Sequence, residues 1–470
     1  MNQSSAQAEP ASASLLFYGF LALLFWLPLP LGSNRWWALA LFELAAMILA
    51  MVWLVLYLRG RLTTGAALAQ AAPALFLLVA ALAWMCLQIV PLPPAWIAVL
   101  SPEAMRVHEL SGSSPTLSLN PFASRAALFE SLSLVLVFCL TLVLVNSRQR
   151  LRALSIVLIV SGVCQAAYGS LMTLSGLEYG FVVEKEAYRG VATGTFVNRN
   201  HLAGYLELCL AVGIGLLLSE LAQERSPHWR AGVRRFLQSM LGRKGLLRLS
   251  LVVMVIALVL TRSRMGNIAF FASLGITGLL YLSARRRITR SGLLFFASLL
   301  VVDLLIVGNF FGVEKVVQRL QETSAVTEHR DEVVQESLQI IADYPLSGTG
   351  AGSYYSTYPS YSTGVVPQVY DHTHNDYVEI ASELGLVGFA LLAAAVIYCL
   401  YLALRALFRR RDPVMQGCAF ACVMGTLALL IHSLTDFNLQ IPANAALFVV
   451  ILALGVISAS GRFAPVTVDN

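Results

Sequence analysis

The chain has 470 residues, of which 58% are hydrophobic and only 12% are charged. Soluble domains carry about 25% charged residues. A chain this apolar has too little polar surface to face water on all sides, so its composition excludes a soluble globular protein and predicts an integral membrane protein.

The chain contains repeated apolar runs of about 18 residues or more, the length needed to cross roughly 30 Å of hydrocarbon. Only helices satisfy the backbone in single segments of this kind. We therefore predict an all-α membrane protein with about twelve transmembrane helices. Their predicted limits are 15–33, 36–57, 72–91, 127–146, 152–174, 201–219, 248–263, 265–283, 292–311, 383–404, 414–434 and 441–459.

The first apolar run is predicted to be a span rather than a signal peptide. It is too long for one, and neither a basic segment nor an Ala-x-Ala cleavage site frames it.

Basic residues predict the orientation in the membrane. Most of the 32 lysines and arginines fall in the tail or in loops after the even-numbered spans. Cytoplasmic loops collect Lys and Arg, so both termini are predicted to be cytoplasmic. This asymmetry, with some attraction to anionic membrane lipids, accounts for the net charge of +6. No nucleic-acid partner is needed to explain it.

The predicted orientation divides the chain into three parts. Residues 1–311 hold spans one to nine with short loops, 312–382 form one long periplasmic loop between spans nine and ten, and 383–470 hold the last three spans and the tail. The loop contains the amphipathic stretch EHRDEVVQESLQIIADYPL and the tyrosine-rich stretch GSYYSTYPSYSTG. These tyrosines could stack on sugar rings or pack within the loop.

The long loop ends in a histidine pair, His372 and His374, followed by Asn375 and Asp376. Histidine has an unperturbed pKa near neutrality and suits a general base. A metal site is an alternative, although no third ligand at helical spacing is evident. The histidines could also merely cap the tenth span.

A second constellation lies in YRGVATGTFVNRNHLAGYLE, which runs into the sixth span and contains Arg189, Asn198, Arg199 and Asn200. The asparagines could cap the helix. Alternatively, helix N-termini attract phosphate and arginines bind it bidentately, so the segment could form an anion site.

A third constellation is TRSRMGN, in which Arg262 and Arg264 interrupt two apolar spans. Arginines near a bilayer end can reach back to the interface. Charges at membrane depth more often face a cavity or a partner, so we predict a phosphate contact. Arg330, on the amphipathic loop stretch, could join this group or be solvated.

The sequence predicts no metal and no cofactor. All seven cysteines fall within predicted spans, no metal-ligand spacing appears, and neither a Walker loop nor a dinucleotide fingerprint is present.

Between about Arg189 and Phe389 the chain resembles the O-antigen ligase/polymerase superfamily (Wzy_C type). GTFVNRNHLAG resembles the family's Gly-x-Phe-x-Asn-Pro-Asn-x-x-Ala segment, and TRSRMG its Ser-Arg-x-Gly turn. DYPLSGTGAGSY and then HTHNDYVEIASELGLVG resemble its periplasmic loop, with His-Asn, a short spacer and Gly-x-x-Gly. One departure is Arg199, which stands where the family more often has proline.

The resemblance implies a GT-C-type fold and metal-independent transfer of a glycan from undecaprenyl pyrophosphate in the periplasm. By position it implies that His374 is the catalytic base and that Arg189 and Arg264 contact the pyrophosphate. His372, Asn375 and Arg330 are implied as supporting residues.

These observations predict an inverting glycosyltransferase in the bacterial inner membrane, of the O-antigen ligase type, with lipid A-core as acceptor. Alternatives are a polymerase of O-antigen or exopolysaccharide, which would use another lipid-linked glycan as acceptor, and a protein O-oligosaccharyltransferase. A flippase for lipid-linked glycan is a different class. It would not need a proton-accepting histidine, and the sequence shows neither the half-repeats nor the broken spans typical of transporters.

Overall fold

A computed structural model describes residues 11–181, 183–221, 242–284, 330–363 and 370–461. The prediction of a helical membrane protein is confirmed, because nine helices of this part of the chain are long and apolar enough to span a membrane. They are α2 (Trp36–Leu58), α4 (Ala72–Ile89), α7 (Pro121–Leu144), α8 (Arg148–Ser175), α9 (Arg199–Leu221), α12 (Arg264–Ala284), α17 (Asp376–Arg409), α18 (Pro413–His432) and α19 (Pro442–Ser460).

Two further predicted spans are also helices, α1 (Ala11–Trp26) and α11 (Arg243–Leu260). The polar TRSR stretch does separate α11 from α12, as predicted. The predicted span 292–311 lies outside the described residues, so the count of twelve stays a prediction.

The two largest errors in the predicted boundaries have local causes. The first predicted span reaches residue 33, but α1 ends at Trp26. Proline disfavours helix at the residue before it and cannot donate within one, and Pro28 and Pro30 follow at once. The tenth span, predicted from residue 383, begins at Asp376, because the Asn375 side chain caps the helix by accepting from the backbone of Tyr377 and Val378.

Helix α17 is also broken, which the sequence analysis did not find. Gly385 has a φ of 63° and lies outside the helical region, a conformation that glycine adopts without steric cost. Carbonyl groups freed by the break accept other donors: Glu383 from the Gln88 side chain and Leu384 from the Trp84 indole. The break separates a polar first segment from the apolar remainder, which explains why hydropathy misplaced the start of the span.

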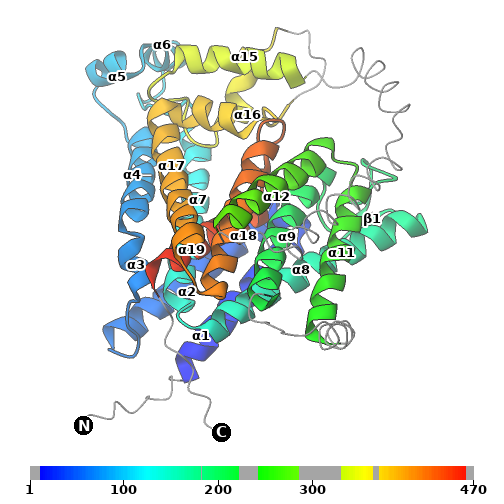
Figure 1. Ribbon diagram of the computed structural model, residues 1–470. Coiled ribbons are helices and arrows are strands. Elements are labelled where there is room, and N and C mark those ends of the chain that lie inside the picture. Colours follow the sequence, from blue (N-terminus) through cyan, green and yellow to red (C-terminus); the bar gives the residue numbers. More distant parts are fainter. Residues whose placement is uncertain (1–10, 182, 222–241, 285–329, 364–369, 462–470) are drawn as a thin grey trace.

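Short elements gather at one end of the bundle, at the top of Figure 1. They are α5 (Pro94–Leu100), α6 (Pro102–Ser111), α15 (Arg330–Asp343), α16 (Tyr354–Thr357) and the 3-10 helix η2 (Tyr358–Ser360). The apolar face of α15 packs there against α5, α6 and the tyrosine-rich stretch.

The sequence left open whether the tyrosines of this layer stack on sugar rings or pack within the loop. Tyr354 and Tyr358 are buried and stacked, with ring centroids 5.3 Å apart. The Tyr358 hydroxyl donates to Glu336 at 2.7 Å. For these two residues the structure favours loop packing over stacking on sugars, whereas Tyr355 is exposed.

The remaining short elements are α3 (Ala66–Gln70), the 3-10 helices η1 (Leu31–Ser33) and η3 (Asn438–Gln440), and an antiparallel hairpin of β1 (Tyr179–Gly180) and β2 (Val183–Glu184). Tyr179 pairs with Glu184 and Gly180 with Val183.

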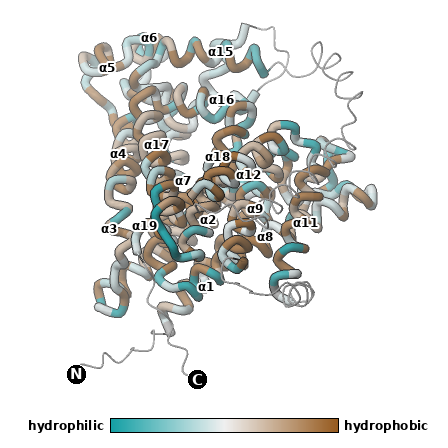
Figure 2. The backbone as a smooth tube through the Cα atoms, in the orientation of Figure 1, coloured by the Kyte–Doolittle hydropathy of each residue, from teal (hydrophilic) through white to brown (hydrophobic). Residues whose placement is uncertain are grey.

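The centre of the bundle is α9, which packs against α18, α8, α11 and α19. Apolar residues cover most of these helices (Figure 2). A methyl group on Gly215 would collide with the carbonyl oxygen of Gly417, so α9 and α18 touch backbone to backbone. Small residues permit such close helix contacts in membranes. The contact fixes the position of the polar groups at the ends of both helices.

Candidate functional site

The polar site is centred on Asp436, in the turn between α18 and η3. Its side chain is almost fully buried. Oδ1 lies 3.5 Å from Nε2 of His201 and 3.9 Å from Nδ1 of His374. Oδ2 accepts a hydrogen bond from the Asn200 side chain and lies 3.7 Å from Nη1 of Arg330. One carboxylate thus joins the start of α9, the start of α15 and the histidine loop.

The electrostatics of Asp436 follow from these neighbours. Burial by itself would raise the pKa of the carboxyl group. The imidazoles of His201 and His374 outweigh burial, and with His432 they hold the pKa of Asp436 well below its usual range. Asp436 is therefore ionised at neutral pH and presents a fixed negative charge to both imidazoles.

Phe437 organises the three histidine rings. Its ring stacks on His372 with centroids 4.1 Å apart, and it meets His201 and His374 edge-on at 4.6 and 4.8 Å. Its backbone amide donates to Oδ1 of Asp436 at 2.9 Å. The dipeptide at 436–437 therefore places charge and ring surface together against the histidine pair.

His374 has the features of a group that can take up a proton. Its φ of 54° is unusual for a residue with a side chain, and such backbone conformations cluster at functional sites. Nδ1 is buried, faces Asp436 at 3.9 Å and has no hydrogen-bond partner, and Nε2 likewise forms no hydrogen bond with any residue that the structure describes. One nitrogen is thus held beside a carboxylate and the other remains able to accept.

His372 is in a different state. Its Nδ1 lies 2.6 Å from Oε1 of Glu379, in the first turn of α17. Burial opposes the charged form, but the Glu379 carboxylate outweighs it and raises the pKa of His372 to about 9. His372 is thus a cation at neutral pH. It cannot accept a proton there, which separates its role from that of His374.

This ion pair predicts a pH-dependent stability. The pKa of His372 rises from 6.5 to about 9 on folding. Its contribution, roughly 3 kcal/mol at most, is therefore fully present below pH 6.5 and is lost as the pH rises through about 9. The thermal midpoint in detergent should fall more steeply between these pH values for the wild type than for His372→Gln. Parallel curves would contradict the assignment.

The first turn of α17 is tied to the end of α18. Oδ2 of Asp376 accepts from the Ser433 hydroxyl at 2.6 Å, and the backbone amide of Leu439 donates to the same carboxylate. The Tyr377 hydroxyl donates to the carbonyl of Leu430. These bonds hold the histidine loop beside Asp436.

The asparagines predicted as site residues have mainly structural contacts. Asn198 accepts from the backbone amide of Asn200 at 2.8 Å, which is a capping bond. Asn375 caps α17, and its amide donates to the carbonyl of Leu434 at 3.0 Å. Asn200 differs, because its side chain donates to Asp436.

Among the predicted arginines, the structure brings only Arg330 to this cluster, where Nη1 also donates to the Thr435 carbonyl at 3.0 Å. Arg189 is exposed and donates to Glu184 and to the carbonyl of Lys185. Arg262 and Arg264 are exposed and form no hydrogen bond or ion pair with a described residue.

The other arginines nevertheless lie on segments that adjoin the start of α9. Arg199 begins α9 and lies over the Tyr188 ring at 5.7 Å. The backbone amide of Ala192 donates to the carbonyl of Leu260, which joins the segment after Arg189 to the TRSR turn. A Cβ on Gly266, two residues after Arg264, would meet Ala203 of α9. Direct roles for Arg189, Arg199, Arg262 and Arg264 stay predictions.

Sequence reasoning missed the centre of the cluster. Asp436 and Phe437 lie in the six-residue connection 435–440 between the last two predicted spans, and the sequence analysis predicted no role for them. It also predicted no role for His201. A buried pair was missed as well: Nδ1 of His432 lies 2.9 Å from Oε1 of Glu207, and both side chains are fully buried between α18 and α9. The available signal was an ionisable residue inside an apolar span.

In the part of the chain that the structure describes, no group of three or more His, Cys, Asp or Glu side chains is arranged to hold a metal ion. The seven cysteines, all of them described, are free thiols.

Apolar spanning helices with a buried histidine–aspartate cluster at one end define a multi-pass membrane protein with a polar site where the bundle meets its outer layer. Residues 249–393 match the O-antigen ligase (Wzy_C) family. The chain thus carries an O-antigen ligase domain, which confirms the resemblance. The domain indicates a membrane glycosyltransferase of the ligase/polymerase family with lipid-linked glycan substrates.

The matched region begins in α11 and ends in α17. It includes Arg262, Arg264, Arg330 and the histidine pair, but neither Arg189 nor Asp436. No curated protein matches the chain.

Proposed function

We propose that the protein is an inverting glycosyltransferase of the O-antigen ligase type, which transfers a glycan from undecaprenyl pyrophosphate to a hydroxyl group of lipid A-core. The observation that carries this proposal is the position of His374, whose Nδ1 lies 3.9 Å from Oδ1 of Asp436 and whose ring forms no hydrogen bond with a described residue.

In the proposed reaction, Nε2 of His374 accepts the proton of the acceptor hydroxyl as its oxygen attacks the anomeric carbon. The new glycosidic bond forms as the bond from that carbon to the pyrophosphate oxygen breaks, which inverts the anomeric centre. Undecaprenyl pyrophosphate leaves with the bonding electrons. Asp436 stabilises the imidazolium that forms, the role a carboxylate has beside a catalytic histidine elsewhere.

The departing pyrophosphate needs positive charge beside it. Arg264 and Arg262 are proposed to supply it, because both are exposed and no described residue engages them. Arg189 and Arg199, on the adjoining segment, are proposed to add further positive charge. His372 adds a fixed cation, whereas Arg330 acts through Asp436 and Thr435. This set could neutralise the leaving group without a metal or cofactor.

The proposal includes the predicted topology. The site faces the periplasm of a bacterial inner membrane, both termini are cytoplasmic, and about twelve spans form a GT-C-type fold. The proposal also keeps the three predicted parts 1–311, 312–382 and 383–470, with the site where the middle part meets the ends of α9 and α18.

The test is transfer by purified protein given an undecaprenyl-pyrophosphate glycan and separate acceptors, without added metal. Label on lipid A-core supports the ligase. A ladder on the lipid supports the polymerase, and label on protein supports the oligosaccharyltransferase. Failure to release undecaprenyl pyrophosphate with any acceptor, together with translocation of the glycan lipid in vesicles, would favour a flippase.

Arg264→Ala is expected to lower the transfer rate by about 10–100-fold, because it removes positive charge from the leaving group. Its thermal midpoint should stay near that of the wild type, since an exposed arginine without partners among the described residues contributes little stability. Arg59→Ala is the matched control, an exposed arginine at the C-terminal end of α2. Equal rates for the two variants would remove Arg264 from the site.

A further inference from the structure

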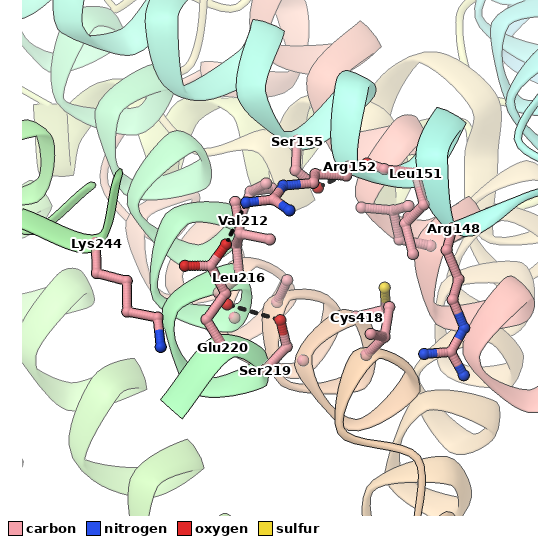
Figure 3. Close-up of a pocket in the computed structure, with 15 residues that line it drawn as sticks. Arg148, Leu151, Arg152, Ser155, Val212, Leu216, Ser219, Glu220, Lys244 and Cys418 are labelled. Atoms are coloured by element: carbon pink, nitrogen blue, oxygen red, sulfur yellow. Dashed lines mark hydrogen bonds and ion pairs between the residues drawn. The ribbon is translucent and has the colours of Figure 1, made fainter. Parts of the chain in front are cut away.

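A second polar feature lies at the other end of α9 and α18. A cavity of about 560 Å³ opens there between α8, α9, α11, α18 and α19 (Figure 3). Its lining includes Glu220, which follows His201 by 19 residues along α9. At 1.5 Å per residue the two lie about 28 Å apart. The cavity is therefore separate from the histidine cluster.

The rim of the cavity is cationic. Arg148, Arg152 and Lys244 line it together with a single lining carboxylate, Glu220. Arg152 donates to Glu220 at 2.8 Å, and Arg148 pairs with Asp412 outside the lining. Both arginine side chains are about two-fifths to one-half exposed, and ion pairs of this exposure contribute little. Nε of Arg148 has no hydrogen-bond partner and both guanidinium groups are partly exposed, so the rim retains donors for a further anion.

The floor of the cavity is apolar. Side chains of Leu151, Val212, Leu216, Ala421 and Leu454 form it. The backbone contact between the glycines of α9 and α18 contributes no side chain to fill the space. Figure 3 shows Arg148, Arg152, Glu220 and Lys244 around the cavity, with Leu151 and Leu216 among them. A soluble phosphate compound would find no partner on this floor, whereas an acyl chain would lie against it without loss.

We propose that this cavity binds an anionic phospholipid. The phosphate would bind at Arg148, Arg152 and Lys244, and one acyl chain would lie along the floor. Basic pockets between transmembrane helices are suited to anionic headgroups, and the volume is within the range of ligand pockets. The predicted orientation places the cavity in the cytoplasmic leaflet. The proposal does not depend on the chemistry of the histidine cluster.

The test uses the purified, delipidated full-length protein in detergent. Phosphatidylglycerol in large excess over its Kd should raise the thermal midpoint by about 3–5 °C, and native mass spectrometry should show it bound. Phosphatidylcholine of the same acyl length should not. Inorganic phosphate should leave the midpoint unchanged, and a full shift with phosphate alone would overturn the assignment to a lipid.

The double variant R148Q/R152Q should lose the preference for phosphatidylglycerol. The control R59Q/R61Q, which removes two exposed arginines outside the cavity, should keep it. Should the double variant fail to fold, Leu216→Trp fills the floor, leaves both arginines in place and should abolish the lipid-dependent shift. An unchanged preference in a folded R148Q/R152Q or L216W protein, or equal shifts with both lipids in the wild type, would overturn the proposal.

Discussion

Substituting His374 by alanine is expected to lower glycan transfer by about 10²–10⁴-fold, the range that a positioned general base contributes. The expectation follows from the two nitrogens of the ring. Nδ1 faces Asp436 at 3.9 Å, and Nε2 has no hydrogen-bond partner among the described residues. The measurement is the single-turnover rate with a lipid-linked glycan and an acceptor.

The fold should tolerate this change. His374 forms no hydrogen bond with a described residue, and alanine, which also carries a Cβ, leaves the strain of the positive φ as it is. Binding of the glycan lipid should therefore persist, which distinguishes a lost base from a lost fold. His108→Ala is a useful contrast, because that buried histidine bonds Ser113 and Thr116 within the same outer layer but lies outside the cluster.

His108→Ala should reduce the thermal midpoint and leave the rate per folded molecule nearly unchanged. His374→Ala should lower the rate per folded molecule and leave the thermal midpoint nearly unchanged. A His374→Ala protein that keeps at least one-third of the wild-type rate would exclude His374 as the base, and the proposed reaction with it.

The spans were predictable because apolar length is a local property. Eleven predicted spans correspond to helices, and errors arose where local chemistry overrode hydropathy. Pro28 and Pro30 end α1 early, and Asn375 begins α17 early. The break at Gly385 depends on two residues of α4, Trp84 and Gln88, which bond the freed carbonyl groups. No pattern within the sequence of α17 reveals these partners.

The histidine pair was predictable because its members lie close together in sequence, but their partners were not. Asp436 reaches His374 only because the start of α17 packs beside the end of α18, and it reaches His201 at the start of α9. Such a contact follows from tertiary packing rather than from spacing. The same limit applies to the arginines, since nothing in the sequence distinguished Arg330, which joins Asp436, from Arg189, which pairs with Glu184.

Asp436→Asn should lower the transfer rate by at least about 10²-fold, because it removes the charge that orients His374 and stabilises its protonated form. Asparagine nearly keeps the shape of the side chain, so the histidine rings should still pack around Phe437. A cost of roughly 1–3 kcal/mol is expected from imperfect hydrogen bonding at a buried position. The rate per folded molecule and the thermal midpoint are the two measurements.

Asp376→Asn provides the matched control. Asp376 is equally buried at the same end of the bundle, and it accepts from Ser433 and Leu439 but forms no hydrogen bond or ion pair with a described histidine. Asparagine keeps an oxygen that can accept these bonds and hold the histidine loop in place, so the substitution should lower the thermal midpoint by a similar amount but spare the rate. If both variants lower the rate per folded molecule equally, the carboxylate at 436 serves the fold alone. A selective loss at Asp436 would instead mean that the catalytic unit is a histidine from the long loop joined to an aspartate from the opposite connection, assembled only when α17 and α18 pack together.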